Sequence, residues 1–369
     1  MGKLVLIGGG HAHLLILQNI HRFIERGFTV EVIGSTPFHY YSGMGPGMLA
    51  GTYRPEEIRF ATGDEVTGRG GRFILDTAEE IIADQRRIRL KSGEILEYDI
   101  LSCNCGSEVI NDIAVDDSGM VFRVKPIENL LRLQEKIVER GKLQALHIAI
   151  IGGGPSAAEI AGNILHLASS EGLTPMRVSV LCRHGFMDRF SARVQRLCRE
   201  SLADRGVEIL TDQAVERIGK DGIFMRDGRC LPTDMVCLAT GVRPSSLFSD
   251  SGLPTGADGG LLVNSSLQCG QYPEIFGGGD CISFAPSPLD KVGVYAVRQN
   301  PVLLHNLLAA LEGRELQSFS PGSEYLRIFN LGQGIGVLQK GGIVFGGRLA
   351  FFIKDFIDRR FMRRFQYQG

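Results

Sequence analysis

The sequence lacks the features that mark several classes of protein. Its 40 Lys and Arg residues against 41 Asp and Glu give a net charge of −1, which offers no general attraction for nucleic acid. It contains no apolar run long enough to cross a bilayer. Strand-like residues begin at Lys3, so we expect no signal peptide. The eight cysteines are scattered without a Cys-x-x-Cys pair, so we expect reduced thiols, no metal site and a cytoplasmic location.

What the chain does have is one motif that occurs twice. The apolar run 4–7 leads into Gly8–Gly10, and the run 148–151 leads into Gly152–Gly154. Each glycine triplet is followed by a stretch with helical character. Glycines at the end of a strand let the backbone approach a pyrophosphate, and the helix that follows offers unpaired N–H groups to it. Two such motifs predict two dinucleotide sites, as in electron transfer between a flavin and a nicotinamide.

The order of the remaining segments predicts how these two units are arranged. A strand at 275–277, ending in Gly279-Asp280, comes after the second unit and would complete the first sheet. We therefore expect an α/β fold with two Rossmann-like, three-layer ββα domains, the second inserted in the first. The predicted bounds are residues 1–115 and 245–315 for the first domain, 116–244 for the second, and 316–369 for a small C-terminal α+β cap.

These motifs, taken together, carry a family resemblance. The chain resembles the FAD-dependent pyridine nucleotide-disulfide oxidoreductases. Within them it is most similar to the type II NADH dehydrogenase-like flavoprotein that is associated with selenide, water dikinase. The matching segments are the two glycine triplets, Glu159, the ATGVRP run at 239–244, Gly279-Asp280, and the stretches 42–57, 291–307 and 353–362.

The resemblance implies two cofactors and a direction of electron flow. FAD would bind the first domain and NADH or NADPH the second, with hydride passing from nicotinamide to flavin. The residues expected to bind these cofactors are Gly8, Gly10, His11, Ala12, Ser35, Ser42, Gly106, Gly152, Gly154, Ser156, Arg183, Gly241, Gly279, Asp280 and Val292.

Two further residues are candidate catalytic residues on the same grounds. Glu159 would point toward the contact between nicotinamide and flavin, where it orients the ring or carries a proton. Lys291 would stand before a helix that faces the flavin pyrimidine and would stabilise the anionic reduced flavin. The simpler readings are a carboxylate in the first turn of a helix for Glu159, a surface lysine for Lys291 and a helix cap for Asp280.

Both units lack the acidic residue that normally binds the ribose 2′-hydroxyl. The second strand of the first unit ends in Ile33-Gly34-Ser35, so the Ser35 hydroxyl or backbone groups would replace the acid. In the second unit Cys182 and Arg183 occupy that position. An arginine there can pair with the 2′-phosphate of NADPH. The alternative is a solvated surface arginine.

The expected electron acceptor is a small molecule, with a quinone as the first choice. The segment 39–48 contains no cysteine, which argues against dithiol chemistry beside the flavin. Two alternatives stay open. One is a sulfide or selenium-compound:quinone oxidoreductase, and the other is a low-turnover flavoprotein that partners a selenophosphate-synthesising enzyme.

The C-terminal stretch is the second candidate site. On a helical wheel one side carries the apolar residues Leu349, Phe352, Ile353, Phe356 and Ile357. Arg359, Arg360, Arg363 and Arg364 follow and make the end strongly basic. Such a helix can lie on an anionic membrane surface, here the inner face of the membrane. The alternatives are a homodimer contact and packing on the body of the protein.

Overall fold

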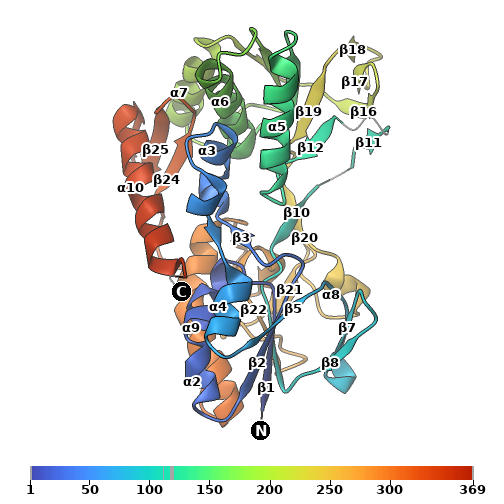
Figure 1. Ribbon diagram of the computed structural model, residues 1–369, viewed down its shortest axis with the longest axis vertical. Helices are drawn as coiled ribbons and strands as arrows, with labels where there is room; N and C mark the ends of the chain where they lie inside the picture. The colour runs from blue at the N-terminus through green and yellow to red at the C-terminus, as the bar shows by residue number, and fades with distance from the viewer. Residues whose placement is uncertain (1, 111, 117–119, 368–369) are drawn as a thin grey trace.

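The computed structural model describes residues 2–110, 112–116 and 120–367, and it has an α/β fold with two parallel sheets (Figure 1). The first sheet has the order β22-β9-β1-β2-β5. Its strands are β1 (Lys3–Ile7), β2 (Thr29–Gly34), β5 (Arg72–Leu75), β9 (Ile100–Cys103) and β22 (Ile275–Gly277). All pairs are parallel and the strands are largely buried, which is why they read as near-continuous apolar runs. The predicted fold class is confirmed.

The second sheet repeats this plan with the order β12-β19-β13-β14-β15. Its strands are β12 (Val121–Arg123), β13 (His147–Ile151), β14 (Arg177–Leu181), β15 (Val207–Leu210) and β19 (Met235–Leu238). The helices that cover and connect the two sheets are α3 (Gly45–Leu49), α4 (Thr62–Gly68), α5 (Asn129–Gly141), α6 (Pro155–Ser170), α7 (Ala192–Ala203), α8 (Leu247–Asp250) and α9 (Gly293–Glu312).

The chain passes between the sheets along two antiparallel segments, β10 (Ser107–Val109) and β20 (Val242–Pro244). After β20 it returns to the first sheet, where β22 lies parallel to β9. In Figure 1 these crossing strands lie between the lower body, which contains the N-terminus, and the upper body. The strand that ends before Gly279-Asp280 therefore completes the first sheet, as the sequence order indicates.

Smaller sheets fill the edges. They contain β3 (His39–Tyr40), β4 (Arg59–Phe60), β6 (Ala78–Ile82), β7 (Arg87–Leu90), β8 (Ile95–Glu97), β11 (Ala114–Val115), β16 (Val215–Gly219), β17 (Gly222–Met225), β18 (Cys230–Leu231), β21 (Leu261–Val263) and β23 (Ile282–Phe284). The sequence predicts a strand over 81–84. These bounds are wrong, because β6 ends at Ile82 and residues 83–85 form the short helix η4.

The C-terminal part is a three-stranded antiparallel sheet followed by one helix. Its elements are β24 (Arg327–Asn330), β25 (Gly336–Lys340), β26 (Ile343–Gly347) and α10 (Arg348–Phe365). The sheet lies against α6, where Gly162 leaves no room for a Cβ beside the Leu331 carbonyl. In Figure 1 α10 runs along one side of the molecule, from the upper body down toward the lower one.

The helix after the first glycine triplet differs from its prediction. The sequence predicts one helix over 14–26. The structure has three short pieces, η1 (His11–His13), α1 (Leu14–Gln18) and α2 (Ile20–Ile24). The break falls at Asn19, whose Nδ2 donates to the Leu15 carbonyl over 2.7 Å. A short amide side chain that bonds the backbone competes with the regular helical pattern.

Candidate functional site: a cleft at the first glycine loop

The first glycine loop is held tightly between two strand ends. Gly8 has a φ of +85°, a conformation that favours glycine, and a Cβ there would collide with the Asn104 carbonyl. Its N–H donates to the Ile33 carbonyl over 2.8 Å. Glycine is thus required for the loop to turn at the carboxyl end of β1, which is where open α/β sheets bind their ligands.

His13 stands where dinucleotide motifs usually have a third glycine or alanine. Its Nδ1 donates to the Gly8 carbonyl over 2.6 Å, and its Nε2 accepts from the Ser102 hydroxyl over 2.9 Å. Burial lowers the pKa of His13 to about 4, so the ring is neutral near pH 7. The two hydrogen bonds of His13 therefore connect the first glycine loop to Ser102 of β9.

A cleft of about 840 Å³ opens at this loop. Its volume lies within the range of small-molecule and cofactor sites. The predicted residues that line it are Gly8, Gly10, His11, Ser35, Ser42, Gly106, Gly279 and Asp280. Ala12 is buried behind the loop, and Val292 precedes the lining residue Gly293. Residues from distant parts of the chain, from Gly8 to Asp280, thus line one cleft, and their role in cofactor binding stays a prediction.

Within the cleft Asp280 forms an ion pair with Lys125, a residue that is not among the predicted site residues. Lys125 Nζ lies 3.0 Å from Asp280 Oδ2 and donates to Ser107 Oγ over 2.7 Å. The Ser107 hydroxyl in turn donates to Asp280 Oδ2 over 2.9 Å. Lys125 follows β12 of the second sheet, so its position depends on how the two sheets meet. No motif in the sequence signals that arrangement.

The cleft also presents a polar atom without a protein partner. The Nδ2 of Asn104 is buried and has no hydrogen-bond partner in the described part of the chain. Buried donors are normally paired, so an unpaired one that lines a cleft suits a ligand that supplies acceptors. Together with the glycine loop and the cleft volume, this donor fits a dinucleotide such as FAD.

Lys291 does not line this cleft. Its Nζ lies 2.6 Å from Asp258 Oδ2 and also contacts the Ile282 carbonyl. The side chain is 15% exposed, so it is neither a free surface lysine nor a cation directed into the cleft. Its role toward the flavin stays a prediction, and Lys125 is the lysine that the fold places at the cleft.

The second glycine loop has the backbone of a dinucleotide motif. Gly152 has a φ of +146° and a Cβ there would collide with the Ala239 carbonyl. Gly154 caps α6 and has open space where a Cβ would point, while Ser156 in the first turn is exposed. Gly241, with a φ of +98°, lies on the crossing segment next to β20, and Arg183 is exposed just beyond β14. These positions suit a second dinucleotide, and the role of each residue stays a prediction.

Glu159 lies farther along α6, against the C-terminal part. Its Oε1 accepts the Asn330 N–H over 2.8 Å. Burial raises the pKa of Glu159 to about 7, although Lys354 and the Asn330 bond lower it. A carboxyl group with such a pKa is partly protonated at neutral pH and can give or take a proton. The location of Glu159 beside the nicotinamide and the flavin stays a prediction.

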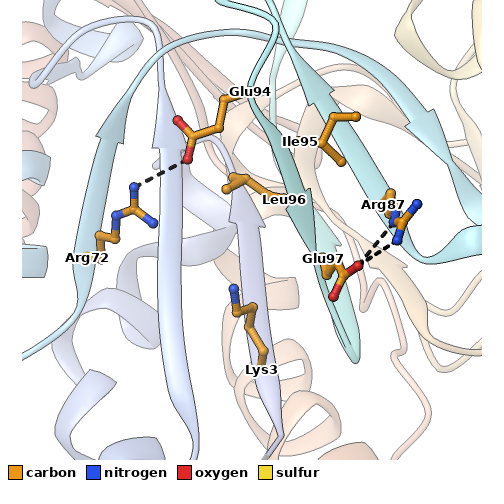
Figure 2. Close-up of a pocket in the computed structure, with 7 residues that line it drawn as sticks. All are labelled: Lys3, Arg72, Arg87, Glu94, Ile95, Leu96 and Glu97. Carbon is orange, nitrogen blue, oxygen red and sulfur yellow. Dashed lines mark hydrogen bonds and ion pairs between the residues drawn. The ribbon is translucent and has the colours of Figure 1, made fainter.

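A second hollow, shown in Figure 2, lies away from both glycine loops. It is lined by Lys3, Arg72, Arg87, Glu94, Ile95, Leu96 and Glu97. Four of its charges pair with each other, Arg87 with Glu97 over 2.8 Å and Arg72 with Glu94 over 3.4 Å, and Lys3 pairs with Glu31 over 3.3 Å. Paired, solvated surface charges of this kind mark an open surface rather than a ligand site.

Two glycine loops at the carboxyl ends of two parallel sheets, with a cofactor-sized cleft at the first, define a protein that binds two dinucleotides. The comparison with family models agrees. Residues 2–306 match the pyridine nucleotide-disulphide oxidoreductase model, and the chain belongs to that family. Its members are flavin-dependent NAD(P)H oxidoreductases, so the predicted enzyme class and the cofactors FAD and NAD(P)H are confirmed at this level.

Curated relatives are distant. The chain is 22% identical to ferroptosis suppressor protein 1 of Xenopus tropicalis, covering 93% of this chain and 90% of that protein. It is 26% identical to the NADH oxidase of Methanocaldococcus jannaschii, covering 83% and 70%. The nitrite reductase [NAD(P)H] of Emericella nidulans is 23% identical over 76% of this chain, which spans only 26% of that protein's length.

Solved structures share the fold over nearly the whole chain. The sulfide:quinone oxidoreductase of Aquifex aeolicus superposes with a TM-score of 0.81 at 18% identity, covering 99% of this chain and 92% of that one. NDH2 of Plasmodium falciparum, solved with NADH, superposes with a TM-score of 0.80 at 13% identity, covering 99% and 100%. Both superpositions include the C-terminal part.

We expect that Asp280→Ala weakens FAD retention roughly 10- to 100-fold, because a charge-assisted hydrogen bond in the cleft contributes about 1.5–3 kcal/mol. Flavin absorbance per protein after ultrafiltration measures the loss. Asp290→Ala, a change of an exposed aspartate that does not line the cleft, is the matched control. Equal FAD retention in both variants would contradict a role for Asp280 in binding.

Proposed function

We propose that this protein is an FAD-dependent NAD(P)H dehydrogenase that passes electrons to a quinone. The observation that carries the proposal is the cleft at the first glycine loop. Residues of both sheets line it, and α10 contacts its border through Phe361 on His11 and Lys354 on Gly43. FAD bound there would accept hydride from NAD(P)H and hand on the electrons. In this proposal residues 1–115 and 245–315 form the FAD domain, 116–244 the NAD(P)H domain and 316–369 the cap.

Different residues of the chain would bind the cofactor, stabilise its reduced form and exchange a proton. Gly8 and Gly10 admit the pyrophosphate, Asn104 donates from the floor of the cleft, and Asp280 accepts hydrogen bonds from the ribityl hydroxyls. Lys125 adds a positive charge near the reacting end, where it favours an anionic reduced cofactor. Glu159, with a pKa of about 7, can exchange a proton near the second loop.

Helix α10 is the part of the protein through which we propose membrane contact and entry of the quinone. Its residues Leu349, Phe352, Phe356 and Ile357 are 62%, 65%, 52% and 41% exposed, so the apolar stripe faces outward. No helix among the described residues meets the length and hydropathy needed to span a bilayer. We therefore propose peripheral contact of this face with the inner side of the membrane, from which a lipid-soluble quinone could enter.

Stopped-flow spectroscopy tests the proposed function. Rapid bleaching of the flavin by NAD(P)H, followed by recovery on addition of a quinone, is the expected result. Bleaching by sulfide or selenide instead would support the alternative oxidoreductase. Flavin that stays oxidised with either donor would favour a low-turnover partner protein and would overturn the dehydrogenase.

Arg183 should set the choice of nicotinamide. We expect that Arg183→Glu lowers the NADPH-to-NADH ratio of flavin reduction rates by about tenfold, because the guanidinium is exposed and its pairing with the 2′-phosphate is weakened by solvent. Arg189→Glu, at another exposed arginine, is the control. A ratio that is the same in wild type and Arg183→Glu would show that the arginine plays no part in cofactor choice.

A further inference from the structure

Two histidines from distant parts of the sequence form a hydrogen-bonded pair in the cleft. His11 follows the first glycine loop and His39 lies in β3. His39 Nε2 lies 3.1 Å from His11 Nδ1, and the two rings meet edge to face with centroids 4.9 Å apart. Both residues line the cleft. We refer to them as the histidine dyad.

At the other end of the dyad, His11 is surrounded by aromatic rings. His11 Nε2 is buried and has no hydrogen-bond partner in the part of the chain that the structure describes. The ring of Phe361 is stacked on His11 at 5.8 Å, with Tyr41 at 5.3 Å and Phe60 at 6.4 Å. These three rings pack around the His11 ring, and we call them the aromatic cage. Because Phe361 belongs to α10, the cage lies between the cofactor cleft and the helix proposed to meet the membrane.

The protonation state of the dyad suits proton transfer. Burial, assisted by the positive charge of Lys125, lowers the pKa of His11 to about 4. Burial, His11 and Lys125 lower the pKa of His39 to about 3. The nearby Tyr41 hydroxyl donates to Asp358 over 2.9 Å, so it does not compete for His11 Nε2. A neutral imidazole has one N–H and one bare nitrogen, so a proton that arrives at one ring can leave from the other.

The proposed reaction requires such a proton. A quinone becomes a hydroquinone by taking up two electrons and two protons. The hydride that NAD(P)H gives up supplies two electrons and one proton, so the second proton must come from water. A buried reaction site needs a path for it, and a neutral chain of hydrogen-bonded imidazoles provides one.

We propose that the histidine dyad conducts this second proton, from the cleft side at His39 through His11 Nε2 to a quinone oxygen at the aromatic cage. The inference rests on the proposed quinone reductase function. It adds to it a proton path through two histidines, of which His11 is also an expected cofactor-binding residue. During each turnover one proton enters at His39, one leaves from His11, and the dyad returns to its neutral state.

The test compares two acceptors with the same FAD-loaded enzyme. A water-soluble short-chain benzoquinone needs both electrons and protons, whereas ferricyanide takes electrons alone. Turnover per bound FAD is measured with each acceptor for wild type, His39→Gln and His11→Gln. The control is His21→Gln, which changes an exposed histidine of α2 that does not line the cleft.

The expected result is a fall in the quinone-to-ferricyanide ratio of at least about tenfold in both dyad variants, in line with the usual contribution of a positioned proton donor. The His21→Gln ratio should match wild type. Parallel losses with both acceptors, or an equal fall in His21→Gln, would overturn the relay and leave the dehydrogenase standing. A wild-type enzyme that reduces ferricyanide but no quinone would overturn the quinone assignment and the relay together.

Discussion

Replacing Lys354 by Met should destabilise the protein by about 3–5 kcal/mol, because one member of a buried ion pair is removed and the other is left without compensation. Lys354 Nζ lies 2.7 Å from Asp358 Oδ2 and donates to the Gly43 carbonyl over 2.7 Å. Both side chains are nearly inaccessible, at 10% and 6% exposure. Urea unfolding of the FAD-loaded protein, followed by fluorescence, gives the midpoint shift.

Two further variants make the result specific. Lys340→Met changes an exposed lysine of β25 and should alter the free energy of unfolding by no more than about 0.5 kcal/mol. Lys354→Met combined with Asp358→Leu removes both charges and should recover more than half of the loss. A double variant that is no more stable than Lys354→Met would show that the two charges do not stabilise each other.

This ion pair has a consequence for the cofactor cleft. Gly43 lies in η2 (Ser42–Met44), directly after the cleft-lining Ser42. Tyr53, beyond α3, donates to Asp355 over 2.7 Å. The segment that borders the cleft is therefore held in place by polar contacts to α10. Although burial lowers it, the carboxylates Asp358 and Glu159 raise the pKa of Lys354 above its ordinary value, so the pair is intact at neutral pH.

The glycine triplets were sufficient to predict the fold, because they combine local and global requirements. A strand, a glycine turn and a helix start must follow one another in sequence, and two positive-φ glycines at Gly8 and Gly152 mark the loops. The return of β22 followed from the order of the strands. Several of the predicted cofactor-binding residues line one cleft because the carboxyl ends of parallel strands share one edge of the sheet, and their role in binding stays a prediction.

What the sequence could not show depends on contacts between distant segments. Lys125 reaches Asp280 because the two sheets meet there, and His39 reaches His11 because β3 folds back over the glycine loop. Neither pairing has a fixed spacing in the chain. Lys291 shows another limit of the sequence. Its place before α9 suggests a cofactor contact, the structure pairs its side chain with Asp258, and its role toward the flavin stays a prediction.

The C-terminal helix shows most clearly what a helical wheel does and does not reveal. The wheel separates the apolar stripe from Lys354 and Asp358 correctly, but it does not say which side faces the protein. In most amphipathic surface helices the apolar side packs inward. Here Lys354 and Asp358 are buried and the apolar side is exposed. An outward apolar face rimmed by charges indicates an interaction surface.

Changing that surface should abolish membrane binding without affecting the cofactor. We expect that Phe352→Glu combined with Phe356→Glu lowers partitioning onto anionic vesicles at least about 100-fold, because burying a Phe contributes about 1.5–3 kcal/mol. Arg360, Arg363 and Arg364 are exposed and would add attraction to anionic lipid, while Arg359 is paired with Glu57 and Asp355. FAD content should stay at the wild-type level, since neither phenylalanine lines the cleft.

The measurement is flotation with vesicles of three parts phosphatidylcholine and one part phosphatidylglycerol at low and high salt. Wild-type binding should weaken as salt rises, because the arginine contribution is screened. Leu143→Glu, a charge placed at an 83% exposed leucine after α5, is the matched control and should float like wild type.

The same variants also test the alternative explanation, in which the apolar face of α10 is a homodimer contact. If wild type does not float but forms a dimer that the double variant converts to a monomer, a second copy of this chain covers the apolar face of α10. In that event the proposed route from the membrane to the aromatic cage would lose its physical basis, and a water-soluble acceptor would become the better candidate.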